Sequence, residues 1–343
     1  SPEKGESELF NEWNPTYRKK LWLFLFLFVA AFIAALSMGY SSLPLDRILQ
    51  VLSGNGAFKE NYVFYQIRLP RALVLTMAGA CLAGAGIILQ TLSNNDLADS
   101  GLLGINSGAG LGVTIFYLFA GEGMLQFSAV LPLVAFISAL VAASTVYLLS
   151  FSRSHKQHAM QLVVIGAGIS SAFSGLIILL MSSSDRTDVS FIAAWMSGNI
   201  WGSTWPFVFT ILPGWLLAMG VLFLKAPTLN ILALGEEAAI ALGLKLRNEK
   251  LILLLCAVAI ASAAISLTGN IGFIGLMSPH IAKKLVGKRH ERFSWIALLV
   301  GSSILLIADA IGRTVMDTAF PTGIVVSLIG APYFLYLLLG KMR

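Results

Sequence analysis

The chain has 343 residues, of which 57% are hydrophobic and only 12% charged, and its formal net charge is +6. Soluble domains carry about 25% charged residues, so this composition excludes a water-soluble globular domain and indicates a protein that crosses the bilayer many times. The net charge does not indicate nucleic-acid binding, because in a membrane protein the placement of basic residues matters more than their sum.

Apolar segments follow one another along the chain, each close to the roughly 20 residues that a helix needs to cross a bilayer. They predict an all-α polytopic membrane protein with about ten transmembrane helices. We expect residues 1–20 to form a cytoplasmic N-terminal segment and residues 21–340 to form one transmembrane domain. The expected spans are residues 21–40, 72–90, 101–120, 126–150, 160–181, 206–224, 251–268, 272–287, 294–312 and 322–340.

Basic residues are distributed unevenly between the two sides of these spans. Of the 23 Lys and Arg residues, all but six fall on the side that holds both termini. Since cytoplasmic loops are enriched in Lys and Arg, both termini are expected in the cytoplasm. The six residues on the other side are Arg47, Lys59, Arg68, Arg71, Arg186 and Arg313.

Residues 191–205, FIAAWMSGNIWGSTW, are too short to span and rich in Trp. They predict a half-helix near the outer interface, where indole rings are favoured. An eleventh span is the alternative, but it would invert the orientation of everything that follows.

Two short segments share an aliphatic–Gly–aliphatic–x–Ser pattern: LLGINS at 102–107 and FIGLMS at 273–278. They lie half a chain apart and begin spans that run in opposite directions. Inverted five-helix repeats with broken helices at equivalent positions produce such a pattern and mark a transport pathway. Coincidence remains the alternative for so short a pattern. The pathway residues expected in the first copy are Gly104, Ser107 and Gly108.

The second copy lies in GNIGFIGLMSPHIAKKLVGKRH at 269–290, where glycines and a proline interrupt an apolar run. Gly272, Gly275 and Pro279 predict an irregular start to a short eighth span, whose freed backbone groups must be satisfied inside protein or in a water-lined cavity. His280 directly follows the proline, and we interpret it as part of this broken helix rather than as a metal ligand.

Side chains that could carry catalysis are sparse. The sequence contains no H-E-x-x-H, no G-x-S-x-G and no Walker A motif, so neither an enzyme nor an ATP-binding chain is indicated. His155 and His158 lie in a predicted loop without acidic partners, and Cys81 and Cys256 lie in apolar runs as expected of core residues. No catalytic residue, metal or cofactor is expected.

Residues 225–250 form the longest expected cytoplasmic loop. Within it, Glu236–Leu242 predicts a two-turn helix that Gly243 ends. A helix this short needs a partner to pack on. It could lie on its own membrane domain, or it could dock into a groove of a cytoplasmic protein.

Three arginines, Arg68, Arg71 and Arg313, fall at helix ends on the outer side, where positive charge is depleted. They could contact lipid headgroups or backbone carbonyls, or they could pair with the carboxylates of a docking protein. Asp309 lies four residues before Arg313 in the ninth span, a spacing that predicts an ion pair.

Several long motifs resemble one family in the same order. They are QIRLPRALVLTMAGACLAGAGIILQTLSNNDLADSGLLGINSGAGLGV at 66–113, LGEEAAIALGL at 234–244, GNIGFIGLMSPHIAKKLVGKRHER at 269–292, the Ala308–Asp309 pair with Arg313, and PTGIVVSLIGAPYFLYLLL at 321–339. Together they resemble the FecCD family, the permease subunits of ABC importers for iron–siderophore complexes, haem and cobalamin.

The resemblance implies the type II importer fold, with ten helices in each of two permease subunits and an ATPase dimer below. It implies a bacterial cytoplasmic membrane protein whose arginines at 68, 71 and 313 meet glutamates of an extracytoplasmic binding protein. The second subunit could be identical or related. The residues expected to couple to the ATPase are Leu234, Gly235, Glu236, Glu237, Ala238, Ala239, Leu242 and Gly243.

A ferric siderophore is the expected cargo, with haem or cobalamin as the alternative. An ion-coupled secondary transporter is the competing class, and it would need ionisable residues at mid-membrane. The chain departs from the family pattern twice: Asn95–Asp96 stands where Asn-Pro is usual, and Lys283 or Lys284 stands where Arg is usual.

Overall fold

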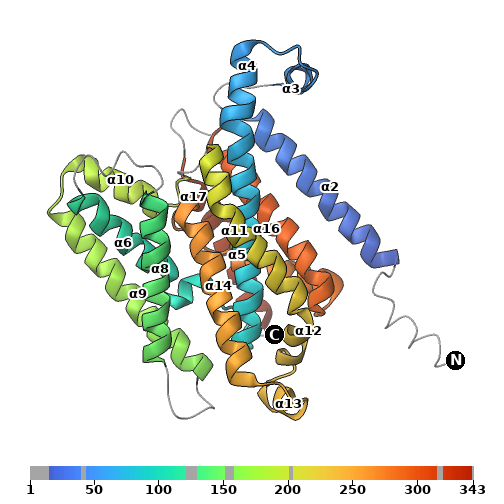
Figure 1. Cartoon of the computed structure of the whole chain (residues 1–343), viewed down its shortest axis with the longest axis vertical. Coiled ribbons are helices and arrows are strands. Elements are labelled where there is room, and N and C mark those ends of the chain that lie inside the picture. The colour runs from blue at the N-terminus through green and yellow to red at the C-terminus, as the bar shows by residue number, and fades with distance from the viewer. Residues whose placement is uncertain are drawn as a thin grey trace.

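The computed structural model describes residues 15–39, 44–120, 130–150, 158–200, 204–314 and 320–341, and throughout these ranges the regular structure is helical (Figure 1). In this part of the chain, seven helical segments are long and apolar enough to cross a membrane. They are α2 (Pro15–Ser37), the continuous run Phe58–Ser93, α8 (Val130–Leu149), α9 (His158–Ser182), α11 (Trp205–Leu224), α14 (Leu246–Thr268) and α16 (His290–Gly312).

Three further helices complete the set of predicted spans: the shorter α6 (Ile105–Phe119) and α15 (Ile274–Val286), and α17 (Thr322–Lys341). Each expected span therefore corresponds to one helix, which confirms the polytopic all-α architecture. The remaining elements are α3 (Leu45–Leu52), α4 (Phe58–Tyr62), the π-helix η1 (Val63–Arg68), α5 (Leu69–Ser93), the 3₁₀-helix η2 (Ser100–Leu103), α10 (Arg186–Met196), α12 (Ala226–Leu232) and α13 (Glu236–Ala241).

Helix α5 forms the centre of the molecule (Figure 1) and contacts α11, α14, α15 and α16. Its small residues allow backbones to approach closely, as is typical of helix packing in membranes. A Cβ on Gly79 would lie 2.6 Å from the Gly301 carbonyl oxygen of α16, and a Cβ on Gly86 would lie 2.0 Å from the Gly275 oxygen of α15. The glycines of α5 thus set how closely α15 and α16 can pack.

Helices α2 and α9 lie at the edge of the bundle and bury little of their surface. Large apolar side chains remain exposed on them, for example Phe26 at 69% and Leu179 at 66%. In water such surfaces would be costly, whereas hydrocarbon solvates them and leaves only the backbone to be satisfied by the helix itself.

Some boundaries differ from the expectation. Helix α2 begins at Pro15 rather than at residue 21. The basic residues that follow Pro15 can lay their aliphatic stems along the helix while their charged ends reach the interface. Lys20 Nζ, for example, donates to the Leu285 carbonyl. The second span is longer at its start because α4 and η1 continue into α5. Pro70 lacks an N–H and crowds the preceding turn, which accounts for the wider π-helical turn just before it.

The Trp-rich segment also differs in detail. Helix α10 has 11 residues and is too short to span, as predicted, but it begins at Arg186. Trp195 does not lie at an interface: it is 1% exposed, and its carbonyl oxygen lies 2.5 Å from where a Cβ on Gly269 would be. Residues 201–203 of this segment, and the expected loop histidine His155, lie outside the described residues.

Candidate docking surfaces and broken helices

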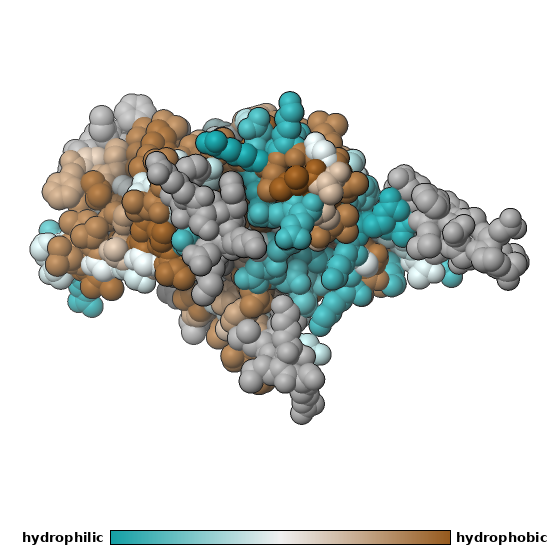
Figure 2. All heavy atoms as spheres, turned by 90° about the horizontal axis from the view of Figure 1, so that it is seen from below, coloured by the Kyte–Doolittle hydropathy of each residue, from teal (hydrophilic) through white to brown (hydrophobic). Residues whose placement is uncertain are grey.

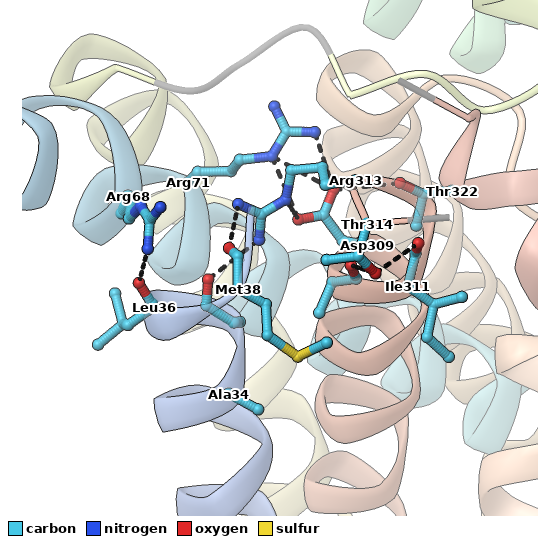
Figure 3. A network of polar contacts seen from close by, with 12 residues as sticks. Ala34, Leu36, Met38, Arg68, Arg71, Asp309, Ile311, Arg313, Thr314 and Thr322 are labelled. Carbon is cyan, nitrogen blue, oxygen red and sulfur yellow. Dashed lines mark hydrogen bonds and ion pairs between the residues drawn. The ribbon is translucent and has the colours of Figure 1, made fainter. Parts of the chain in front are cut away.

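One end of the bundle carries the three predicted arginines, and we call it the arginine end, defined by Arg68, Arg71 and Arg313 (Figure 3). Arg71 Nη2 lies 2.8 Å from Asp309 Oδ1, and its Nε donates to both carboxylate oxygens at 3.2 Å. Arg313 Nε forms an ion pair of 2.8 Å with Asp309 Oδ2, as the spacing predicted. Thr322 Oγ1, at the start of α17, donates to Oδ1. One buried carboxylate therefore holds together α5, α16 and α17.

Two of the arginines also satisfy the last carbonyls of α2, which have no intrahelical donor. Arg68 donates to the Leu36 oxygen and, at 3.0 Å, to the Ser37 oxygen. Arg313 donates to the Ala35 oxygen at 3.0 Å and to the Met38 oxygen at 3.2 Å. A positive charge at a helix C-terminus is favourable, so both side chains stabilise the end of α2.

Accessibility separates the three arginines. Arg68 is only 5% exposed, whereas the side chains of Arg71 and Arg313 are 18% and 15% exposed. Burial lowers the pKa of the Arg313 guanidinium, and the Asp309 carboxylate beside it opposes that shift. Three guanidinium groups against one carboxylate leave the cluster with an excess of positive charge. The docking role of these residues stays a prediction, with Arg71 and Arg313 the two that solvent reaches.

At each of the two predicted breaks, a residue in the left-handed region stands directly before a helix. Gly104 has φ +69° before α6, and Phe273 has φ +66° before α15. The glycine expected at the second break, Gly272, is not in that region and has open space around it. A bulky residue at positive φ is strained and persists only where its surroundings hold it there. Helices start at Ile105 and Ile274, so the structural register is shifted by two residues from the sequence pattern.

The other predicted pathway residues pack inside the bundle. Ser107 Oγ donates to the Gly104 oxygen at 3.2 Å, and a Cβ on Gly108 would collide with Ala142 of α8. Pro279 lies within α15. The His280 ring stands edge-on to Tyr333 of α17, with 6.1 Å between centroids. No group of three or more potential metal ligands occurs among the described residues.

Sequence reasoning missed the residues that join the two breaks. Asp99 accepts hydrogen bonds from the backbone N–H groups of Ser100 and Phe273, so its carboxylate begins η2 and holds the strained residue before α15. Asn106 Nδ2 donates to Asn270 Oδ1 at 2.7 Å. The two asparagines lie 164 residues apart in the sequence, so no local pattern predicts their contact. The one signal in the sequence that could have pointed to these contacts was the presence of polar residues beside each break.

The opposite end of the bundle holds α12 and α13, and we call it the α13 end (Figure 1). Gly235 at φ +104° and Gly243 at φ +81° flank α13, where the sequence predicted a glycine stop. Ala239 is buried, whereas Leu234, Ile240 and Leu242 are 68%, 60% and 62% exposed. Figure 2 shows this end, with a small apolar patch enclosed by hydrophilic residues.

An ion pair anchors the two-turn helix to α14: Lys250 Nζ pairs with Glu236 Oε1. A second pair, Lys225 Nζ with Glu249 at 2.8 Å, joins the start of α12 to the same long helix. Glu237 points outward as an exposed residue, and Ala238 is half-buried. The helix is therefore held in place through Glu236 and Ala239 while its aliphatic side chains remain available to a partner.

Comparison with known proteins gives the family. The model of the FecCD transport family matches residues 27–340. The iron(3+)-hydroxamate import system permease protein FhuG of Bacillus subtilis is 36% identical over 318 residues, covering 91% of this chain and 94% of that protein. The iron-uptake system permease protein FeuC of the same organism is 32% identical, with 95% and 98% coverage.

A solved structure agrees with the fold. A transporter described as metal-chelate type ABC, in an inward-facing conformation, superposes with a TM-score of 0.81 at 28% sequence identity, covering 94% of this chain and 99% of that one. The relatives are permease subunits rather than enzymes, and their match extends over nearly the whole chain. The chain belongs to the FecCD transport family and is a multi-pass membrane permease of the ABC importer type.

Proposed function

We propose that this chain is the permease subunit of an ABC importer that carries a ferric siderophore across the bacterial cytoplasmic membrane, by alternating access driven by ATP hydrolysis on partner chains. The cargo is argued from the relatives, since both named permeases serve iron uptake and one of them serves hydroxamates. Haem or cobalamin is the alternative cargo within the family.

The observation that carries the proposal is the exposed face of α13. Three aliphatic side chains, Leu234, Ile240 and Leu242, are exposed on and beside a short helix at the end of the bundle opposite the arginines. A short helix with an apolar face fits a hydrophobic groove on a partner. An ATPase dimer at the α13 end is the partner we assign to it.

The arginine end is suited to an acidic partner. The carboxylate of Asp309 balances only part of the charge of Arg68, Arg71 and Arg313. The excess favours an extracytoplasmic binding protein that presents glutamates or aspartates, which would reach Arg71 and Arg313 first. Such docking should weaken as salt is raised, because exposed ion pairs are screened. Affinity that is independent of ionic strength would contradict this role.

A second permease subunit is supported by the edge helix α9. Gly168, Ser171 and Gly175 are exposed on it, and apart from the adjoining residues of α9 itself no atom of the described chain comes within 4 Å of a Cβ placed on either glycine. Exposed small residues on a spanning helix favour packing against another helix. Co-purification of tagged and untagged copies would distinguish a homodimer from a pair of related permeases.

Transport by the reconstituted importer tests the function. Vesicles holding the permease, its ATPase and the binding protein should take up radiolabelled ferric hydroxamate only with an ATPase that hydrolyses ATP. Excess haem or cobalamin should not compete. Uptake that survives an ATPase unable to hydrolyse ATP, and that collapses with the ion gradient, would instead support a secondary transporter. Competition by haem or cobalamin would reassign the cargo and keep the importer.

A further inference from the structure

The broken helix α15 lacks one of its own hydrogen bonds. Pro279 has no N–H, so the carbonyl four residues earlier, on Gly275, has no intrahelical donor. The side-chain amide of Gln90, from α5, occupies that position: its Nε2 donates to the Gly275 oxygen at 3.2 Å and to the Leu276 oxygen at 3.3 Å. Gln90 is 2% exposed. A side chain of one helix therefore completes the backbone of another.

A lysine fixes which way this amide faces. Lys283 Nζ donates to Gln90 Oε1 at 3.0 Å, which leaves the amide nitrogen directed toward α15. The same ammonium pairs with Asp96 Oδ1 at 2.9 Å and lies 5.5 Å from the centroid of the Phe293 ring. Asp96 stands in the loop after α5, at one of the positions where the sequence departs from the family pattern. Its carboxylate thus orients Gln90 through Lys283.

The next residue of α5 connects to the α13 end. Thr91 Oγ1 lies 2.9 Å from Nε2 of His290, and His290 Nδ1 lies 2.8 Å from Oδ1 of Asn230 in α12. The His290 backbone N–H also donates to that Asn230 oxygen at 3.0 Å. Helix α12 directly precedes α13 in the chain. Polar contacts therefore run from the segment beside α13 to Thr91, and the backbone of α5 joins Thr91 to Gln90, which contacts the broken part of α15.

We propose that Gln90, oriented by Lys283 and Asp96, is a positioning residue that transmits movement of α12 and α13 to the broken helix α15 during transport. The proposal rests on the proposed ABC importer function. A displacement of α12 moves the start of α16 and the end of α5 through His290 and Thr91, and Gln90 carries α15 with them. Without that link, α13 can still engage its partner, but α15 no longer follows.

The fully assembled importer in vesicles provides the test, with ferric hydroxamate uptake and ATP hydrolysis measured on the same sample. Gln90→Glu keeps the size of the side chain and its contact with Lys283, but an ionised carboxylate cannot donate to the Gly275 oxygen. We expect ATP hydrolysis within about twofold of the parent and substrate moved per ATP lowered by about tenfold, the range in which coupling energies fall. Asp96→Asn, at a partly exposed site, should lower the same ratio less.

The control is the adjacent lysine. Lys284 lies over the Tyr336 ring and has no contact with Gln90 among the described hydrogen bonds and ion pairs, so Lys284→Ala should leave the ratio unchanged while Lys283→Ala lowers it.

Two outcomes would overturn the positioning role: uptake per ATP in Gln90→Glu and Asp96→Asn equal to that of the parent, or uptake and ATP hydrolysis that fall in parallel, as a general loss of folding would produce. Failure of the proposed function itself is distinguishable, because the parent importer would then show no ATP-dependent uptake.

Discussion

At the scale of single residues, Asp309 is the organising group of the arginine end. It is 1% exposed and pairs with Arg71 and Arg313, while Thr322 donates to the same oxygen that Arg71 approaches most closely. Removing one partner from a buried ion network leaves the remaining charges buried without a counter-charge. That costs more stability than replacing the whole network by apolar side chains.

Asp309→Asn should therefore destabilise the permease by about 3–5 kcal/mol, since two partly buried guanidinium groups lose their counter-charge. The measurement is the temperature at which the purified protein in detergent loses its monodisperse elution peak. Asp46→Asn, an exposed carboxylate of α3, is the matched control and should leave that temperature unchanged. Equal stability of the two variants would show that Asp309 contributes little.

The residue scale also shows where sequence reasoning stops. The pair of Asp309 with Arg313 followed from helical spacing, but its pairing with Arg71 depends on how α5 packs on α16, across 238 residues. Asp99 escaped notice for the same reason, because nothing local places a loop carboxylate beside Phe273. The low exposure of Arg68 could not be predicted from the sequence either, because it depends on the end of α2 covering this side chain.

At the scale of helices, α5 and α15 cross with their backbones in close contact, which sets a clear expectation. Gly86→Ala places a methyl group 2.0 Å from the Gly275 oxygen, which is backbone and cannot move without displacing α15. We expect loss of transport and a lowered thermal stability. Gly220→Ala in α11, where nothing lies within 4 Å, is the control and should be neutral or stabilising by up to about 1 kcal/mol. Full activity of Gly86→Ala would refute the close crossing.

The helix scale also gives a test of the α13 surface. Ile240→Asp replaces an exposed aliphatic side chain by a charge at the centre of the proposed ATPase contact, so co-purification of the ATPase should fall at least about tenfold. Leu49→Asp makes the same change at an exposed position of α3, at the other end of the bundle, and should retain the ATPase. Undiminished co-purification with Ile240→Asp would place the contact elsewhere.

Helices were also the most predictable feature, because length and hydropathy alone define a bilayer span. The departures from the predicted helices have local causes that a hydropathy pattern does not record. The π-helical turn arises at Pro70, and the left-handed residue before α15 is Phe273 rather than a glycine. The two-turn helix at α13 was predictable because glycines mark both of its ends.

At the scale of the whole molecule, the bundle has two chemically different ends, and the bias of basic residues predicts which faces the cytoplasm. Maleimide that cannot cross membranes should label Lys59→Cys in intact cells, and Lys245→Cys only after permeabilisation, in a background where Cys81 and Cys256 are replaced by alanine. Lys59 is exposed in α4, at the very start of the run Phe58–Ser93, and Lys245 is exposed in the loop between α13 and α14. Labelling with the opposite sidedness would invert the assignment of both partners.

The glycine-lined surface of α5 has a consequence for biosynthesis. Helix α5 leaves the ribosome well before α11, α14, α15 and α16, the helices that cover it in the finished protein. Throughout that interval its glycines present bare backbone to lipid rather than to protein. The newly synthesised N-terminal half is thus inserted in the membrane before the helices that pack against α5 exist. A truncated chain ending before α11 should therefore be recognised and degraded by membrane proteases.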